Sequence, residues 1–383
     1  MTAENINDER RAVFGASLSL LAGAASGSLI PGKAFAKQPA MASSSSSKVV
    51  LNGNLGAPMK LIGIEEHFLT AEILKAWSDA GLEATDPSVA FHSGVMEGRL
   101  LNLAEDRIAL MDETGLDIQV LSLTTPALHD LGAESVDLAR RTNDALAAAV
   151  ARHPTRFQAM ATLPMAVPEA AARELERCIK TLGFKGTLLC GKVGKRHLDD
   201  LAFAPVFHTA AELGVPVFLH PRVPDPAVRE AYYSGFSPDV DAAFATYGLG
   251  WHYDAGIQFI RLVLSGTFDR LPNLQVILGH WGELVLFYAE RLAAMDRVSG
   301  LAHPIATYLR KNLYVTASGM FLPHFLERAA VVVGADRLLF STDFPYQYRP
   351  GHEARSFLDN CGLSVQDKAG FAHGNWIRLI GDK

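Results

Sequence analysis

The chain contains eight short apolar segments of the length expected for buried β-strands, and each is followed by a segment with helical spacing of its apolar residues. The segments are apolar throughout rather than alternating, which is typical of parallel strands that helices cover on both faces. They are residues 61–68, 117–125, 156–164, 184–191, 215–221, 274–281, 313–320 and 338–346.

The segments between the predicted strands show the periodicity of amphipathic helices. Leu101, Ala104, Ile108 and Met111 follow one another at intervals of three and four, which predicts that they share one face of one helix. Residues 172–182 show the same spacing. Glycines stand just after three predicted helices, where a left-handed backbone is favoured, at positions 115, 183 and 214.

Eight strand–helix repeats in residues 60–383 predict a single α/β domain with the (β/α)8 TIM-barrel fold. A doubly wound open sheet is the alternative, since it also alternates strands and helices. Such a sheet usually carries a glycine-rich phosphate-binding turn after its first strand. Glu65, Glu66 and His67 stand there instead, so the pattern favours the barrel.

The first 59 residues do not share this pattern. Residues 1–36 contain the arginine pair Arg10 and Arg11, an apolar stretch to Ile30 and small residues at 34 and 36, which is similar to a twin-arginine export signal. Residues 37–59 include a run of serines and predict a flexible linker. We therefore expect export to the periplasm. A membrane anchor is the alternative, but five small residues at 23–27 make stable membrane insertion unfavourable.

Charge and cysteine usage exclude several classes of protein. Lys and Arg number 35 against 41 Asp and Glu, a net charge of -6, which argues against nucleic acid or an anionic membrane as partner. The three cysteines are widely spaced, so neither a disulfide framework nor a cysteine-based zinc site is expected. The 13 histidines are the more informative ligand-type residues.

Side chains with metal-ligand or acid–base chemistry stand at the ends of four predicted strands. Glu65 and His67 belong to the first strand, His220 to the fifth, His280 to the sixth and Asp343 to the eighth. Because barrel enzymes gather their catalytic groups at the carboxyl ends of the strands, we expect these five side chains to lie together. Glu65 and His67 are two residues apart and would point to the same side.

Two carboxylates with two imidazoles are donors that suit one Zn²⁺ or Mn²⁺ ion and leave room for water or substrate. A single histidine at a strand end is more often a structural residue than a ligand. The coincidence of five such residues at strand ends favours a joint site. His129 follows the second strand and its role stays open, whereas surface or capping positions are expected for His153, His303, His352 and His373.

Four segments of the chain resemble one branch of the amidohydrolase superfamily, the metal-dependent nonoxidative decarboxylases. They are residues 64–68, 218–222, 277–283 and 340–345, and the resemblance extends from about residue 60 to the C-terminus. Most hydrolytic members carry His-x-His in the first segment. The Glu-x-His of Glu65 and His67 is similar instead to the γ-resorcylate, 2,3-dihydroxybenzoate and 5-carboxyvanillate decarboxylases.

The resemblance implies an activity and a role for each site residue. The reaction would be loss of CO2 from an ortho-hydroxylated aromatic acid, by an enzyme that is a homodimer or homotetramer. Asp343 would donate a proton to the ring carbon, His280 and Glu283 would handle that proton, and Arg291 would lie behind the metal ligands. The implied metal ligands are Glu65, His67, His220 and Asp343.

Two alternatives use the same residues differently. A hydrolase or hydratase would attack the carbonyl of an ester, lactone or amide with metal-bound hydroxide, with Asp343 as base and His280 stabilising the oxyanion. A binding barrel without catalysis would predict a damaged set of strand-end residues, and all five are present. The fold alone does not choose between decarboxylation and hydrolysis.

Overall fold

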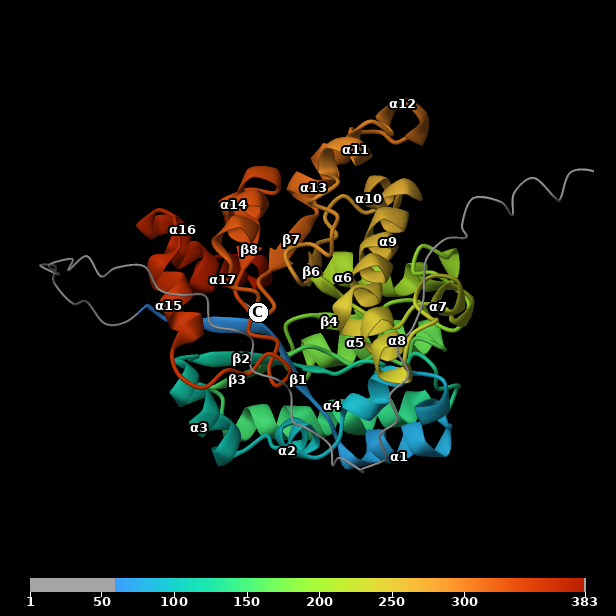
Figure 1. The fold of residues 1–383 in the computed structure, drawn as a ribbon, viewed down its shortest axis with the longest axis vertical. Coiled ribbons are helices and arrows are strands. Elements are labelled where there is room, and N and C mark those ends of the chain that lie inside the picture. The colour runs from blue at the N-terminus through green and yellow to red at the C-terminus, as the bar shows by residue number, and fades with distance from the viewer. Residues whose placement is uncertain (1–58, 382–383) are drawn as a thin grey trace, which may run out of the picture. The chain divides into compact units, whose positions relative to one another are not determined.

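The structure, a computed structural model, describes residues 59–381 and is an α/β arrangement of eight parallel strands surrounded by helices (Figure 1). The predicted signal at 1–36 and the predicted linker up to residue 58 lie outside the described residues. The strands are β1 Ile62–Phe68, β2 Ile118–Leu123, β3 Phe157–Ala159, β4 Thr187–Cys190, β5 Val217–His220, β6 Val276–Leu278, β7 Leu313–Thr316 and β8 Leu338–Leu339.

Backbone contacts close the strands into a TIM-barrel-like ring. The strands pair in chain order within two groups, β1 to β3 and β4 to β8. The first join between the groups is a parallel bridge of Ala161 with Thr187. At the second join, the amide of Ile64 donates to the carbonyl of Phe340 over 2.9 Å. Each strand therefore lies beside its sequence neighbours, as predicted for the barrel and contrary to the open-sheet alternative.

Each observed strand falls within its predicted segment but is shorter. All residues of β1, β2 and β4 are buried, as expected for parallel strands covered on both faces. β6 ends at Leu278, so His280 lies in the loop beyond it, and β8 has only two residues, so Asp343 also follows its strand. The apolar runs continue past the strands because the loops that follow them are buried as well.

The helices form the outer layer of the barrel (Figure 1). None of the helices in residues 59–381 combines the length and hydrophobicity that a membrane span requires. The helices are α1 Ala71–Asp79, α2 Val95–Leu101, α3 Glu105–Thr114, α4 Ser135–Arg152, α5 Pro168–Lys180, α6 Ala204–Leu213, α7 Pro226–Tyr232, α8 Pro238–Ala243, α9 Gly250–Leu264, α10 Thr267–Arg270, α11 Ala289–Ala293, α12 Asp296–Ser299, α13 Ile305–Lys311, α14 Pro323–Val332, α15 Glu353–Asn360, α16 Val365–Ala369 and α17 Asn375–Ile380.

The prediction of one helix face that joins Leu101 to Met111 is wrong. α2 ends at Leu101 and α3 begins at Glu105. The side chain of Asn102 accepts a hydrogen bond from the amide of Ala104 over 3.0 Å, and this local bond replaces a helical one. The chain therefore turns between the two helices, and the four residues do not share one helix face.

The predictions for α5 and for the glycines agree with the structure. Leu175 is fully buried on α5, and Ile179 packs against the core from the same helix. Gly115, Gly183 and Gly214 have φ angles of 74°, 72° and 60°, the left-handed conformation expected after a helix.

α9 packs closely against the loop that follows β6, and a glycine makes this approach possible. A Cβ atom on Gly256 would lie 2.4 Å from the carbonyl oxygen of Glu283, far inside van der Waals contact. The backbone of Glu283 cannot move freely, because the amide of Trp281 in the same loop donates to the carbonyl of Thr316 on β7. Gly256 therefore sets the distance between α9 and this loop.

The substitution Gly256→Ala tests this contact. We expect it to destabilise the fold by roughly 1–3 kcal/mol, since the added methyl group must displace either α9 or the loop. The measurement is the free energy of unfolding from urea denaturation. Gly98→Ala on α2 is the matched control, because a Cβ atom at this position would meet nothing within 4 Å and alanine favours helix. Equal stability of Gly256→Ala and the unmodified chain would contradict the account.

Candidate metal centre and active site

Three predicted ligands meet inside the C-terminal end of the barrel. Glu65 and His67 project from β1 and His220 is the last residue of β5. One donor atom from each lies within 4.8 Å of those of the other two, and all three residues are buried. Glu65 and His67 thus point to the same side of their strand, as their spacing predicts.

Asp343 and His280 border this cluster. An oxygen of Asp343 lies 3.3 Å from Nε2 of His67, and the other lies 3.9 Å from Nε2 of His280. The Asp343 side chain is 10% exposed, so both interactions are largely shielded from water. The structure therefore brings together all five strand-end residues named from the sequence.

The hydrogen bonds around the cluster leave donor atoms directed at one another. Nδ1 of His220 lies 2.8 Å from the carbonyl of Pro221, which places the proton on Nδ1 and leaves Nε2 free as a donor to a metal. Nε2 of His67 and Oε1 of Glu65 are buried and have no hydrogen-bond partner among the described residues. Unpartnered buried polar atoms are costly, and a cation would satisfy both of them together with Nε2 of His220.

Neighbouring hydroxyls set the orientation of Glu65. Thr316 and Ser318 both donate to Oε2 of Glu65, the former over 3.1 Å. The second oxygen, Oε1, is left facing Nε2 of His220 at 3.7 Å. Because both hydroxyls use the same oxygen, the carboxylate presents the other one to the cluster.

Burial shifts the ionisation of two of these groups toward their neutral forms. Burial raises the pKa of Glu65, since no solvent stabilises its charge. Burial and the neighbouring imidazoles lower the pKa of His220 well below its usual value, so it is neutral and able to coordinate. A donor set of one carboxyl group and two imidazoles, joined by Asp343, fits Zn²⁺ or Mn²⁺.

His280 and Glu283 form a buried ion pair beside the cluster. Nδ1 of His280 lies 2.6 Å from one oxygen of Glu283. Burial alone would lower the pKa of His280, but the carboxylates of Glu283 and Glu65 raise it to about 10. Burial opposes ionisation of Glu283, yet His280 and His252 lower its pKa to about 2. The pair is therefore charged at neutral pH in the metal-free protein.

The loops that carry these residues adopt left-handed backbone conformations. His280, Trp281, Glu283 and Asp343 have φ angles of 47°, 55°, 50° and 56°. For residues other than glycine this region costs on the order of 1–3 kcal/mol each, and it persists only where surrounding contacts enforce it. One such contact is the hydrogen bond of 2.7 Å from the amide of His280 to Oγ of Ser318. The strain is concentrated at the site.

His252 and Ser318 belong to the site but were not predicted. Nδ1 of His252 lies 2.7 Å from the second oxygen of Glu283. The Glu283 carboxylate therefore pairs with the imidazoles of both His252 and His280. His252 comes from the first turn of α9, where nothing in the local pattern distinguishes it from a solvent-facing residue. Ser318 follows β7 within the predicted segment 313–320, and its position there is the signal that could have identified it.

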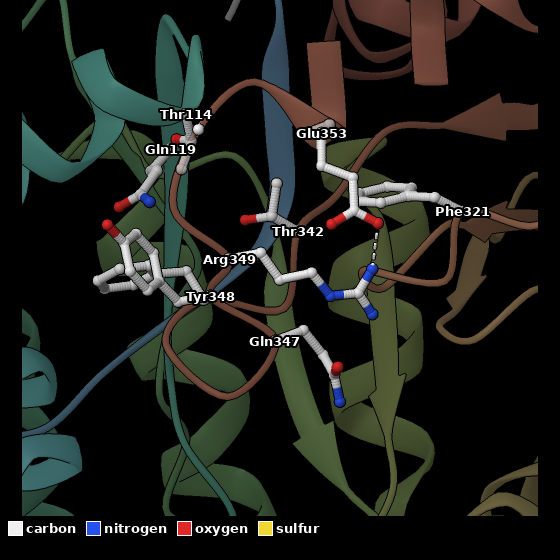
Figure 2. A pocket seen from close by; sticks show the side chains of 11 residues that line it. Thr114, Gln119, Phe321, Thr342, Gln347, Tyr348, Arg349 and Glu353 are labelled. Atoms are coloured by element: carbon white, nitrogen blue, oxygen red, sulfur yellow. Dashed lines mark hydrogen bonds and ion pairs between the residues drawn. The ribbon is translucent and has the colours of Figure 1, made fainter. Parts of the chain in front are cut away.

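Other histidines and Arg291 lie outside the cluster. Arg291 is exposed on α11, and among residues 59–381 no hydrogen bond or ion pair joins it to the five strand-end residues. His129 is buried, and burial lowers its pKa to about 4, but it is not part of the cluster. The pocket in Figure 2 includes Thr342 and Phe344 on either side of Asp343 in the chain, and none of the five strand-end residues lines it.

Comparisons with known proteins agree with this geometry. The family model described as Amidohydrolase matches residues 105–381. The γ-resorcylate decarboxylase of Polaromonas sp. strain JS666 is 35% identical over 335 residues, which are 83% of this chain and 98% of that protein.

Two solved structures are similar over most of their length. One is 5-carboxyvanillate decarboxylase from Novosphingobium aromaticivorans with manganese and 4-hydroxy-3-methoxy-5-nitrobenzoic acid, with a TM-score of 0.77, 31% identity and coverage of 85% of this chain and 99% of that one. The other is a dihydroxybenzoic acid decarboxylase from Polaromonas sp. JS666 with manganese and 2-nitroresorcinol, with a TM-score of 0.73, 34% identity and coverage of 84% and 96%. The chain therefore belongs to the amidohydrolase family.

Proposed function

We propose that this chain is a metal-dependent nonoxidative decarboxylase of an ortho-hydroxylated aromatic carboxylic acid. The observation that carries the proposal is the position of Asp343, between the donor atoms of the metal cluster and the His280–Glu283 pair. The similarity to γ-resorcylate and 5-carboxyvanillate decarboxylases supports the same reaction class. A hydrolase on the same site is not favoured, because these relatives are carboxy-lyases.

Glu65, His67, His220 and Asp343 would hold one Zn²⁺ or Mn²⁺ ion. When bound, the ion supplies Lewis-acid chemistry that orients a substrate carboxylate and its neighbouring phenol oxygen and stabilises their charge. Donors of both kinds, oxygen and nitrogen, are present and preoriented by Thr316 and Ser318 for Glu65 and by Pro221 for His220. Solved relatives that contain manganese support this choice of ion.

Asp343 is the proposed proton donor to the ring carbon that carries the carboxylate. The carbon–carbon bond breaks, its electron pair stays with the ring, the carbon takes the proton, and CO2 leaves. His280 faces Asp343 at 3.9 Å with Nε2, and Glu283 holds its other nitrogen, so the imidazole is oriented to return a proton to Asp343. Each turnover consumes one proton from solvent.

The assay that tests the proposal begins with metal analysis of the purified protein and continues with CO2 release from a panel of ortho-hydroxylated benzoates. We expect about one metal ion per chain and CO2 release that a chelator abolishes and added Mn²⁺ restores. Bound metal without CO2 release from any acid in the panel, together with hydrolysis of esters, lactones or amides, would contradict the proposal.

Asp343→Asn is expected to lower turnover by at least about a thousandfold, because the amide cannot donate a proton as a carboxylic acid does. Part of the metal should stay bound, since Glu65, His67 and His220 remain. The measurements are CO2 release and metal content. Asp137→Asn, an exposed position on α4, is the matched control and should behave like the unmodified chain. Full activity of Asp343→Asn would eliminate its role as donor.

His280→Ala is expected to keep the metal and to lower kcat about 100-fold or more, since the group that returns the proton is removed. Metal content and kcat are measured on the same preparation. The exposed His208→Ala on α6 serves as control. Loss of the metal in His280→Ala would instead make His280 a ligand and require a different account of proton transfer.

We also infer that the chain is exported by a twin-arginine route. Arg10, Arg11 and the following apolar stretch support this, and a route that carries folded proteins suits a metal site assembled from distant strands. Replacing both arginines by lysine should leave the precursor in the cytoplasm of a bacterial host, as measured by cell fractionation. Normal export of the double variant would point to another route.

A further inference from the structure

Glu66 carries a fully buried carboxyl group that the proposed reaction does not use. It lies between the two ligands Glu65 and His67 on β1, but its side chain contacts a different set of residues. Oε1 and Oε2 accept hydrogen bonds from the segment that follows β8, which is far away in the sequence. Glutamate side chains are almost never fully buried unless they are paired, so the partners of Glu66 indicate its role.

The hydrogen bonds to Glu66 come from both chain neighbours of Asp343. The amide of Thr342 donates to Oε1 over 2.8 Å, and the hydroxyl of Thr342 lies 2.6 Å from Oε2. On the other side, the amide of Phe344 donates to Oε2 over 3.3 Å. Asp343 itself has a φ angle of 56°, a conformation that needs enforcement from its surroundings. Glu66 thus accepts hydrogen bonds from the backbone immediately before and immediately after Asp343.

A second buried layer holds Glu66 in turn. The side-chain amide of Gln119 on β2 lies 3.5 Å from Oε2 of Glu66, and its oxygen accepts from Nε of Arg107 over 2.6 Å. Arg107 also donates to the carbonyl of His67 over 2.7 Å and lies 4.6 Å from the centre of the Phe344 ring. Gln119 and Thr342 both line the pocket in Figure 2.

We propose that Glu66 is a positioning residue that holds Asp343 in its left-handed conformation and so places the Asp343 carboxylate at the metal cluster. The inference rests on the proposed function for the role of Asp343. The two faces of β1 then have different roles. Glu65 and His67 offer donor atoms to the metal from one face. Glu66, on the opposite face, aligns Asp343 in the segment that follows β8.

Barrel closure alone does not account for these contacts. The backbone of β1 already bonds the segment after β8 through Ile64 to Phe340 over 2.9 Å and through His67 to Phe344 over 2.7 Å. Those bonds join β1 to Phe340 before Asp343 and to Phe344 after it, without any side chain. The bonds to Glu66 add side-chain contacts immediately before and after Asp343, whose left-handed conformation is unfavourable.

Glu66→Gln tests the proposal with little change in volume. Whichever way the amide is turned, its NH2 group faces the backbone N–H of Thr342 or of Phe344, so one of the two bonds is lost. We expect the affinity for Mn²⁺, measured by titration of metal-free protein, to fall about tenfold. In an Asp343→Asn background the same change should alter the affinity less than about twofold, because Glu66 acts through Asp343.

Equal losses in both backgrounds would overturn the proposal, and so would unchanged affinity in the single variant. Glu174→Gln is the matched control, a mostly buried carboxylate on α5 that Asn143 and Arg177 hydrogen-bond. It should lower the unfolding temperature without changing Mn²⁺ affinity. If Glu66→Gln does not fold, Thr342→Val removes the hydroxyl bond to Oε2 of Glu66 and is tested in the same two backgrounds, with the same expected results.

A kinetic measurement separates this inference from the proposed activity. At saturating Mn²⁺, Glu66→Gln should lower kcat about tenfold or more with KM changed less than about twofold, since Asp343 is misplaced while substrate still binds. A rise in KM with unchanged kcat would overturn the positioning role. The Mn²⁺ titration requires no turnover, so it stays decisive even if the carbon dioxide assay contradicts the decarboxylase proposal.

Discussion

The burial of several ionisable groups within a few ångströms of one another is the constraint on which the rest of the site depends. Glu65, His67 and His220 are nearly inaccessible to solvent, and one donor atom each of Glu65 and His67 has no hydrogen-bond partner in the described part of the chain. Burying each of these groups costs desolvation free energy, and without a cation only neighbouring protein groups offset that cost. A divalent ion satisfies all of them, which links metal binding to the stability of the barrel's C-terminal end.

The scaffold around the cluster limits what each side chain can do. Thr316 and Ser318 donate hydrogen bonds to one oxygen of Glu65 and leave the other for the metal. Oγ of Ser318 also accepts a hydrogen bond from the amide of His280. The residues of the reaction lie in loops with left-handed backbones rather than in the strands. Hydrogen bonds from neighbouring strands enforce these conformations, so the geometry is set before the substrate arrives.

Much of the fold was predictable because parallel strands buried on both faces produce uninterrupted apolar runs. Those runs located all eight strands, and the chemistry at their ends located Glu65, His67, His220, His280 and Asp343. The strand ends were less accurate, because most residues of the loops after β6 and β8 are buried like those of the strands. The break between α2 and α3 was missed, since the local bond of Asn102 leaves no trace in hydrophobic spacing.

Residues that join the site from outer elements were not predictable. His252 reaches Glu283 only because Gly256 lets α9 approach the loop, a tertiary contact without a local signal. Arg291 shows the reverse case: the resemblance implied a place behind the ligands, and the structure exposes it on α11. The roles of the five strand-end residues stay predictions that rest on their geometry and on the family.

Deuterium incorporation tests the central claim, that a metal-assembled site protonates a ring carbon as CO2 leaves. The Mn²⁺-loaded protein is incubated in D2O with an ortho-hydroxybenzoate labelled with ¹³C in its carboxylate. The account predicts ¹³CO2 and a phenol with one deuterium on the carbon that carried the carboxylate, and neither product in the presence of a chelator. A product that retains the labelled carboxylate and gains oxygen from solvent would contradict it.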